Sequence, residues 1–194
     1  VIFWAQVADE GHYVLGDLRT ISFADKTVEG NDETRAAFFA KYEFNTEEHI
    51  DHTVTLYRPF AQLNIGTKYT IDYEKDPYAI QMLESEVTVK KVPTVFNVAT
   101  SAVSGEHNFT FKMHDVLGDA LEVNGEPYKY VAMNYMFAGA GGRTAEVSYK
   151  INAQIKTQNG NSIDEVELNK TVLNVPLKEN YRTNIVGNLL TSST

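Results

Sequence analysis

The densest group of potential metal ligands lies in residues 47–52, where glutamate, histidine and aspartate side chains follow one another closely. In an extended strand alternate side chains share a face, so His49 and Asp51 lie on one face and His52 lies on the other. A metal site would need His49, Asp51 and a third ligand from elsewhere, and no partner motif accompanies them. A metal-dependent hydrolase that uses these residues is therefore the weakest function class, and a solvated acidic segment is the simpler interpretation.

Other motifs with chemical potential have structural explanations. Residues 139–142 are glycine-rich like a phosphate-binding loop, but they join two strand patterns rather than a strand and a helix. His114 follows a strand pattern, and no histidine has an acidic partner in a recognisable catalytic arrangement. The absence of Cys excludes disulfides, thiolate zinc sites and Cys nucleophiles. We therefore predict no catalytic, cofactor-binding or metal residues, no cofactor, and a protein that is not an enzyme.

Two features suggest contact with carbohydrate. The tripeptides that begin at Asn108 and Asn169 match the acceptor pattern for N-linked glycans, which often arises by chance. Trp4 and the 11 tyrosines could provide a platform on which a sugar ring stacks. Most of these aromatic residues are spaced like core or cross-strand residues, so we interpret them as structural. A cell-surface adhesin or carbohydrate-binding β-sandwich module is the alternative function.

The chain that must position these residues has 194 residues and a formal net charge of -9. Its composition indicates a folded protein. Because an acidic chain cannot neutralise a run of phosphates, we expect no nucleic-acid partner. Hydrophobic residues make up 43% of the chain, which is enough to bury a core. No stretch approaches the roughly 18 apolar residues that would cross a bilayer.

Alternation of apolar and polar residues is the dominant pattern and predicts antiparallel strands with one buried face. The clearest case is residues 145–155, where the apolar set is Ala145, Val147, Tyr149, Ile151, Ala153 and Ile155. Similar alternation occurs at Val54/Leu56, Val87/Val89, Phe109/Phe111/Met113 and Val131/Met133/Tyr135/Phe137. Asn124-Gly125 and Asn159-Gly160 are typical of tight hairpin turns. Strand-length segments separated by such turns predict an all-β sandwich.

Two segments depart from this pattern. Residues 31–41 begin with a capping residue, carry acids in the first turn and end on a lysine, which predicts one short helix pinned to the sheet by Phe38 and Phe39. A second helical turn is expected after Asp76, because Pro77 suits a first helical position.

Arg58 and Pro59 interrupt an apolar strand pattern near residues 56–68. Proline cannot donate to a β-ladder, so we expect a sheet edge, a bulge or a crossing between domains at Pro59. We expect Arg58 to pair with a carboxylate or with backbone carbonyls. Residues 1–6 are apolar enough to form an interior strand. A chain that begins inside a strand pattern indicates either that a signal or pro-segment has been removed or that the sequence starts part-way along the protein.

Four motifs occur in order along nearly the whole chain: FWAQ from Phe3, NDETR from Asn31, RPFAQLN from Arg58 and NYRTNIVG from Asn180. Together they resemble the Bacteroidales fimbrillins, the type V pilins. In that family an aromatic-Trp-Ala-Gln strand comes first and is followed by an Asn-Asp-Glu-Thr-Arg helix. Residues 128–135 also match the family's second-domain strand.

The resemblance implies two transthyretin-like β-sandwich domains, with one short helix in the first. Residues 1–58 would form an N-terminal domain that lacks its early strands, and residues 59–194 would form the C-terminal domain. The family's pattern also includes a lipidated Cys, which this sequence lacks.

The resemblance also implies a function, that of a structural subunit of a bacterial surface fimbria that polymerises by donor-strand exchange. The precursor would be a lipoprotein, anchored in the membrane by its lipid, exported through the outer membrane and trimmed at the cell surface. Its expected partners are other copies of the pilin, accessory fimbrial subunits, and host or bacterial surface receptors. A strand added from a neighbour would satisfy unpaired backbone groups and cover an apolar groove at once.

Overall fold

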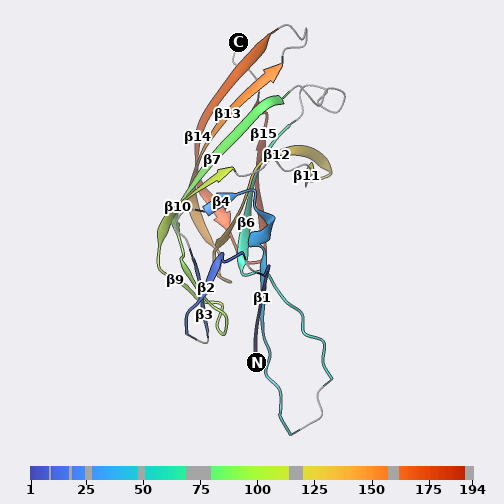
Figure 1. The fold of residues 1–194 in the computed structure, drawn as a ribbon, viewed down its shortest axis with the longest axis vertical. Coiled ribbons are helices and arrows are strands. Elements are labelled where there is room, and N and C mark those ends of the chain that lie inside the picture. The colour runs from blue at the N-terminus through green and yellow to red at the C-terminus, as the bar shows by residue number, and fades with distance from the viewer. Residues whose placement is uncertain are drawn as a thin grey trace.

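The computed structural model describes residues 1–8, 10–17, 19–24, 28–47, 51–68, 80–113, 120–156 and 162–190. In this part of the chain there are fifteen β-strands, one 3₁₀ turn and no α-helix, so the predicted all-β class is confirmed. In Figure 1 the long strands β14, β13 and β7 run side by side up to the top of the view, and β1 lies in the lower part of the molecule. The helical turn predicted after Asp76 lies outside the described residues.

Two sheets make the body of the molecule. The first has the order β14 (Ile163–Leu177), β13 (Arg143–Lys156), β7 (Ile80–Val92), β10 (His107–Met113) and β4 (Val28–Gly30). The second has the order β11 (Ala120–Val123), β12 (Glu126–Phe137), β6 (Phe60–Thr67) and β15 (Arg182–Gly187). Neighbouring strands are antiparallel except for β4 beside β10 and β15 beside β6, which are parallel.

The alternation predicted for residues 145–155 is confirmed in β13, a central strand paired with β14 and β7. All six apolar side chains of the predicted set are buried, whereas the side chains between them are exposed or half-buried. The Asn124-Gly125 turn is also confirmed, because both residues have positive φ where β11 meets β12. Asn159 and Gly160 lie outside the described residues.

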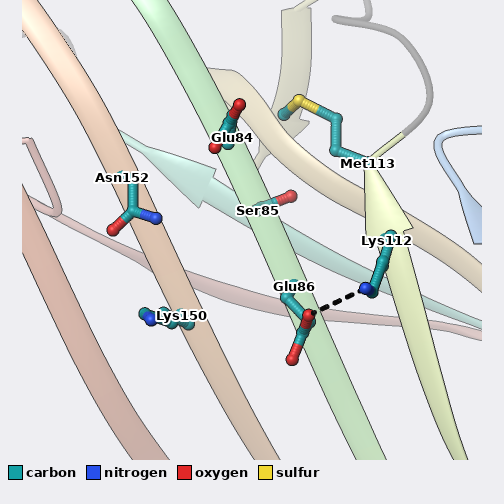
Figure 2. Close-up of a pocket in the computed structure, with 7 residues that line it drawn as sticks. All are labelled: Glu84, Ser85, Glu86, Lys112, Met113, Lys150 and Asn152. Atoms are coloured by element: carbon teal, nitrogen blue, oxygen red, sulfur yellow. Dashed lines mark ion pairs between the residues drawn. The ribbon is translucent and has the colours of Figure 1, made fainter.

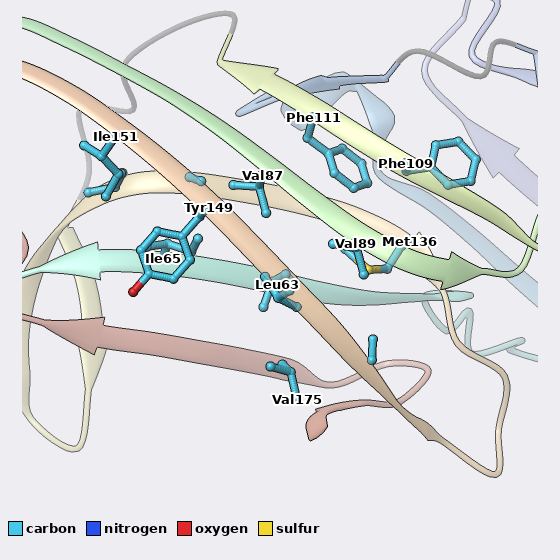
Figure 3. Packing of buried hydrophobic residues seen from close by; sticks show 14 of the residues in the cluster. Leu63, Ile65, Val87, Val89, Phe109, Phe111, Met136, Tyr149, Ile151 and Val175 are labelled. Carbon is cyan, nitrogen blue, oxygen red and sulfur yellow. The ribbon is translucent and has the colours of Figure 1, made fainter. Parts of the chain in front are cut away.

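The space between the two large sheets is filled by the main hydrophobic core, part of which is shown in Figure 3. Leu63 and Ile65 of β6 contribute from one sheet, and Val87 and Val89 of β7 contribute from the other. Each fully buried side chain of this size stabilises the fold by about 1.5–3 kcal/mol. The two sheets therefore form a sandwich that holds the outer surfaces of its strands at fixed positions.

A third sheet closes the lower end, with the order β2 (Tyr13–Leu15), β3 (Thr20–Phe23), β8 (Val95–Asn97) and β9 (Val103–Ser104). Its side chains enter a second core made of Tyr13, Ile21, Ala37, Phe39, Phe60, Phe96, Val98, Met133, Tyr135 and Phe137. Residues from both sides of position 58 thus share this core, and also share two of the sheets. The division of the chain into domains 1–58 and 59–194 stays a prediction.

The short helix predicted for residues 31–41 is wrong. The capping signal is real, because the Asp32 side chain accepts a hydrogen bond from the Thr34 amide, but only the 3₁₀ turn η1 (Glu33–Arg35) follows it. The chain then becomes β5 (Ala37–Lys41). Extended backbone buries Ala37 and Phe39 in the second core, and this packing outweighs the helical preference of alanine.

β1 (Ile2–Gln6) forms a two-stranded sheet with β5. The prediction of an interior strand here is wrong, because four of the five residues are exposed. The strand expected at Val54 and Leu56 is also absent, and the described part of that segment is irregular up to the bridge between Tyr57 and Phe39. Pro59 lies in a bend between this bridge and β6, so it stands where the chain passes from one sheet to another. The expected crossing between domains at this position stays a prediction.

Candidate functional site

The residues that sequence chemistry singled out do not assemble into a metal or catalytic site. His49 and His114 lie outside the described residues, and Asp51 is exposed. The ring of His52 stacks on that of Tyr42, with centroids 4.2 Å apart. Within the described part of the chain no group of three potential ligands could hold a metal ion. Residues 139–142 connect β12 to β13, as the strand patterns predicted.

The carbohydrate-related residues also take structural positions. Trp4 is half-buried, and its ring lies edge-on to that of Tyr13, with centroids 5.7 Å apart. The Tyr13 hydroxyl donates to the Arg35 carbonyl, and its ring belongs to the second core. Asn108 and Asn169 are exposed on strands β10 and β14. These contacts favour the structural interpretation of the aromatic residues.

The pair β1 and β5, which we call the ribbon, is the main exposed apolar feature. Among the described residues, seven of the twelve exposed large hydrophobic residues lie on the ribbon, next to its ends or on the segment after it: Val1, Ile2, Phe3, Val7, Phe44, Leu56 and Tyr57. Residues 1–7 carry no charged side chain. Among the described strands β1 has one neighbour, β5, so its other edge has no strand beside it. An uncharged apolar edge of this kind is a template for an added strand.

The two faces of the ribbon differ. Trp4 pairs with Phe39 on the face that contacts the second core, whereas Phe3 and Ala5 lie on the opposite, outer face. Phe3 is 36% exposed, and Val7, just beyond the strand, is 42% exposed. The inner face therefore fixes the ribbon to the body, and the outer face and the free edge stay accessible.

A polar cluster anchors the start of β5. The His12 Nε2 atom lies 2.8 Å from the Thr34 hydroxyl and 3.4 Å from Asp32 Oδ2, and Arg35 Nε lies 3.3 Å from the same carboxylate oxygen. Burial and the Arg35 charge lower the pKa of His12, although the charges of Asp32 and Glu10 act in the opposite direction. The cluster holds η1 in place and therefore sets where the ribbon leaves the body.

The predicted pairing of Arg58 with a carboxylate or backbone carbonyls is wrong. Its guanidinium lies over the Phe38 ring, with Cζ 5.1 Å from the ring centroid. Its Nε atom is buried without a hydrogen-bond partner, and its backbone N–H donates to Asn180 Oδ1. Arg58 thus packs mainly on the outer face of the ribbon through a cation–π contact.

A polar cavity of about 350 Å³ lies on the first sheet, at the end of β10 (Figure 2). It is lined by Glu84, Ser85, Glu86, Lys112, Met113, Lys150 and Asn152. Glu86 sits between two lysines, because the strand register places Lys112 on one side of it and Lys150 on the other. The Lys112 Nζ atom lies 3.8 Å from Glu86 Oε2. The two carboxylates and two ammonium groups give the cavity no formal net charge.

The sequence of the whole chain, residues 1–194, matches one protein family, a family of unknown function designated DUF6562. The chain belongs to this family. No curated protein matches the chain. Membership of DUF6562 therefore assigns no activity to the chain. A function can be inferred only from the geometry of the ribbon and the cavity.

In the described residues of this DUF6562 protein, no helix is long and apolar enough to cross a membrane. Sequence reasoning identified residues 1–6 as apolar but placed them inside a sheet, and it did not identify the cavity. The available signal for the ribbon was the run of seven uncharged residues at its start. No local signal marks the cavity, because its lining comes from three separate strands.

Proposed function

We propose that this DUF6562 protein is a structural subunit of a bacterial surface fimbria, a pilin whose copies join by exchange of β-strands. The observation that carries the proposal is the free apolar edge of β1. Its support from sequence is the resemblance to fimbrillins, in which the FWAQ motif that forms most of β1 recurs. The proposal includes the transthyretin-like character of the sandwich and the location of the protein at the cell surface.

Physical chemistry supports strand addition at this edge. A two-stranded sheet is marginally stable in water, and a third strand would pair the outward backbone groups of β1. The same strand would cover part of the outer face, where each Å² of apolar surface removed from water contributes about 25 cal/mol. A contact that joins different surfaces of successive copies produces a filament when its rotation does not close into a ring.

The proposal is tested by placing a charge on the ribbon. Phe3→Lys changes an exposed side chain, so the monomer is expected to keep its melting temperature, but a lysine on the edge strand opposes strand pairing. Electron microscopy of the native cell surface, with antibody against this chain, should show filaments for the natural protein and few for the variant. Leu173→Lys, at an exposed position on β14, is the matched control and should leave filaments intact.

Two outcomes contradict the proposal. One is an antibody-labelled cell surface without filaments when the natural protein is present. The other is equal filament formation by Phe3→Lys and Leu173→Lys, which would show that β1 is not the surface where copies join.

A further inference from the structure

Some of the polar groups on the outer face of the first sheet are satisfied by one another. The hydroxyls of Thr88 and Thr110 lie 2.9 Å apart, and so do those of Ser148 and Thr171. The Lys90 Nζ atom lies 2.7 Å from a Glu146 carboxylate oxygen. Cross-strand pairs of this kind are what an ordinary solvated sheet face requires.

Other described side chains on this face, such as Gln154, Glu165 and Glu167, have no hydrogen bond or ion pair, and the cavity differs from their surroundings in being hollow. In the described part of the chain, the side chains of Glu84, Lys150 and Asn152 have no hydrogen bond and no ion pair. They are neighbours, because Glu84 is the register partner of Asn152, and Lys150 lies two residues from Asn152 on the same face of β13. Figure 2 shows the three side chains on adjacent strands, with Met113 beyond Glu84. Three unpaired polar groups therefore surround one hollow.

The chemistry of these groups defines what they can hold. A carboxylate accepts hydrogen bonds, an ammonium group donates them, and a side-chain amide does both. A sugar hydroxyl also donates and accepts, so adjacent hydroxyls of one ring can satisfy all three groups. Met113 also lines the hollow, and the part of this polarizable side chain that does not pack against the main core can contact the C–H groups of a ring.

Charge argues against ionic ligands. Among the described lining residues the formal charges of Glu84, Glu86, Lys112 and Lys150 cancel, so these residues attract neither an anion nor a cation by a net field. A divalent cation would also meet two ammonium groups beside its carboxylates. The cavity volume of about 350 Å³ lies at the small end of ligand sites, which suits a single sugar unit.

We propose that this cavity binds a neutral saccharide, with Glu84, Lys150 and Asn152 as its hydrogen-bonding residues. The proposal does not rest on the fimbrial function, because it concerns a different surface from the ribbon. It also differs from an aromatic sugar platform, since no aromatic ring lines the cavity.

The test is NMR chemical-shift mapping on the chain of residues 1–194, titrated separately with methyl β-D-galactopyranoside, methyl α-D-mannopyranoside and N-acetyl-D-glucosamine. At least one of these neutral sugars should shift amide signals of β7, β10 and β13 around the cavity, with a Kd of about millimolar. L-Alanine and N-acetylneuraminate serve as the zwitterionic and anionic comparators.

Variants decide whether the named residues carry the binding. Glu84→Ala and Asn152→Ala should each raise the Kd about tenfold, because each removes a hydrogen-bonding group. Glu146→Gln, on the same face but outside the cavity, should leave the Kd unchanged. The proposal is overturned if none of the three sugars shifts these signals, if only a comparator does, if the shifts lie elsewhere, or if the variants bind like the natural chain.

Discussion

The ribbon and the outer face of the first sheet are both exposed β-structure, but their side chains differ in kind. On the outer face, hydroxyls and charges pair across strands, as in Lys90 with Glu146. On the ribbon and just beyond it, the apolar side chains of Phe3 and Val7 are exposed to water, and no pairing of polar groups accounts for this exposure. Exposure alone therefore does not mark an interaction surface. The informative regions are the apolar edge with no described strand beside it and the hollow in the polar face.

The largest expected effect is the difference in the free energy of unfolding between substitutions on the two faces of β13. Val147 is fully buried, so Val147→Asp places a charge in the main core and should destabilise the fold by about 3 kcal/mol or more. Ser148→Asp, on the outer face, should change the free energy of unfolding by less than about 1 kcal/mol. Urea unfolding of the two variants measures the difference. Equal destabilisation would show that the outer face is not a solvated surface.

Removal of residues 1–58 should have the next largest effect. The fragment 59–194 loses Ile21 and Phe39 from the second core and Val28 from the main core. We therefore expect it to melt without a sharp transition in calorimetry, whereas the full chain melts cooperatively. A fragment that unfolds cooperatively would support a domain boundary at residue 58.

A smaller effect should distinguish the inner and outer faces of the ribbon. Trp4→Ala removes a half-buried ring that contacts Tyr13 and should cost about 1–2 kcal/mol. Phe3→Ala, on the outer face, should change the free energy of unfolding by less than about 0.5 kcal/mol. Thermal unfolding of monomers measures both. A larger loss for Phe3→Ala would mean that the outer face packs on the body.

A pH-dependent effect is expected in the turn between β14 and β15. Burial raises the pKa of Glu179 to about 7, and one of its carboxylate oxygens has no hydrogen-bond partner. Since this pKa is above that of the unfolded chain, the protonated carboxyl favours folding at low pH, and this advantage is lost as pH rises through about 7. Glu179→Gln should therefore raise the melting temperature more at about pH 8 than at about pH 4. A pH-independent difference would contradict the burial of this charge.

The smallest expected effect concerns the paired charges of the outer face. Lys90 and Glu146 are both substantially exposed, so Glu146→Ala should change stability by less than about 0.5 kcal/mol. Chemical denaturation at low and high salt measures this contribution. A loss of several times that size would indicate that the outer face depends on its ion pairs.

Sequence patterns predicted best the strands that are central and buried on one face only. In β13 the alternation of Val147 with Ser148 and of Ile151 with Lys150 directly reflects the environment of each face. In β12 the last seven residues are buried on both faces, so the identity of its neighbours could not be read from its pattern. The helix prediction failed because capping and alanine content are local signals, while the burial of Phe39 depends on distant strands.

The two candidate surfaces were predictable to different degrees. The apolar character of residues 1–7 is visible in the sequence, but whether a strand covers them depends on sheet order. The cavity depends on the register that brings Glu84 beside Asn152, and a shift of one residue would turn these side chains to opposite faces. Register is a property of the assembled sheet, so no segment alone could reveal the site.

The parallel pairing of β15 with β6 has a consequence for the order in which the chain folds. β6 supplies the centre of the second sheet, yet its partner on one side comes from near the end of the described chain, and the bond from Arg58 to Asn180 spans 122 residues. Contacts between such distant positions are slow to form, because a long loop must close before they contribute. Both neighbours of β6 follow it in the chain, so during synthesis one of its edges stays open until β12 emerges and the other stays open until β15 emerges.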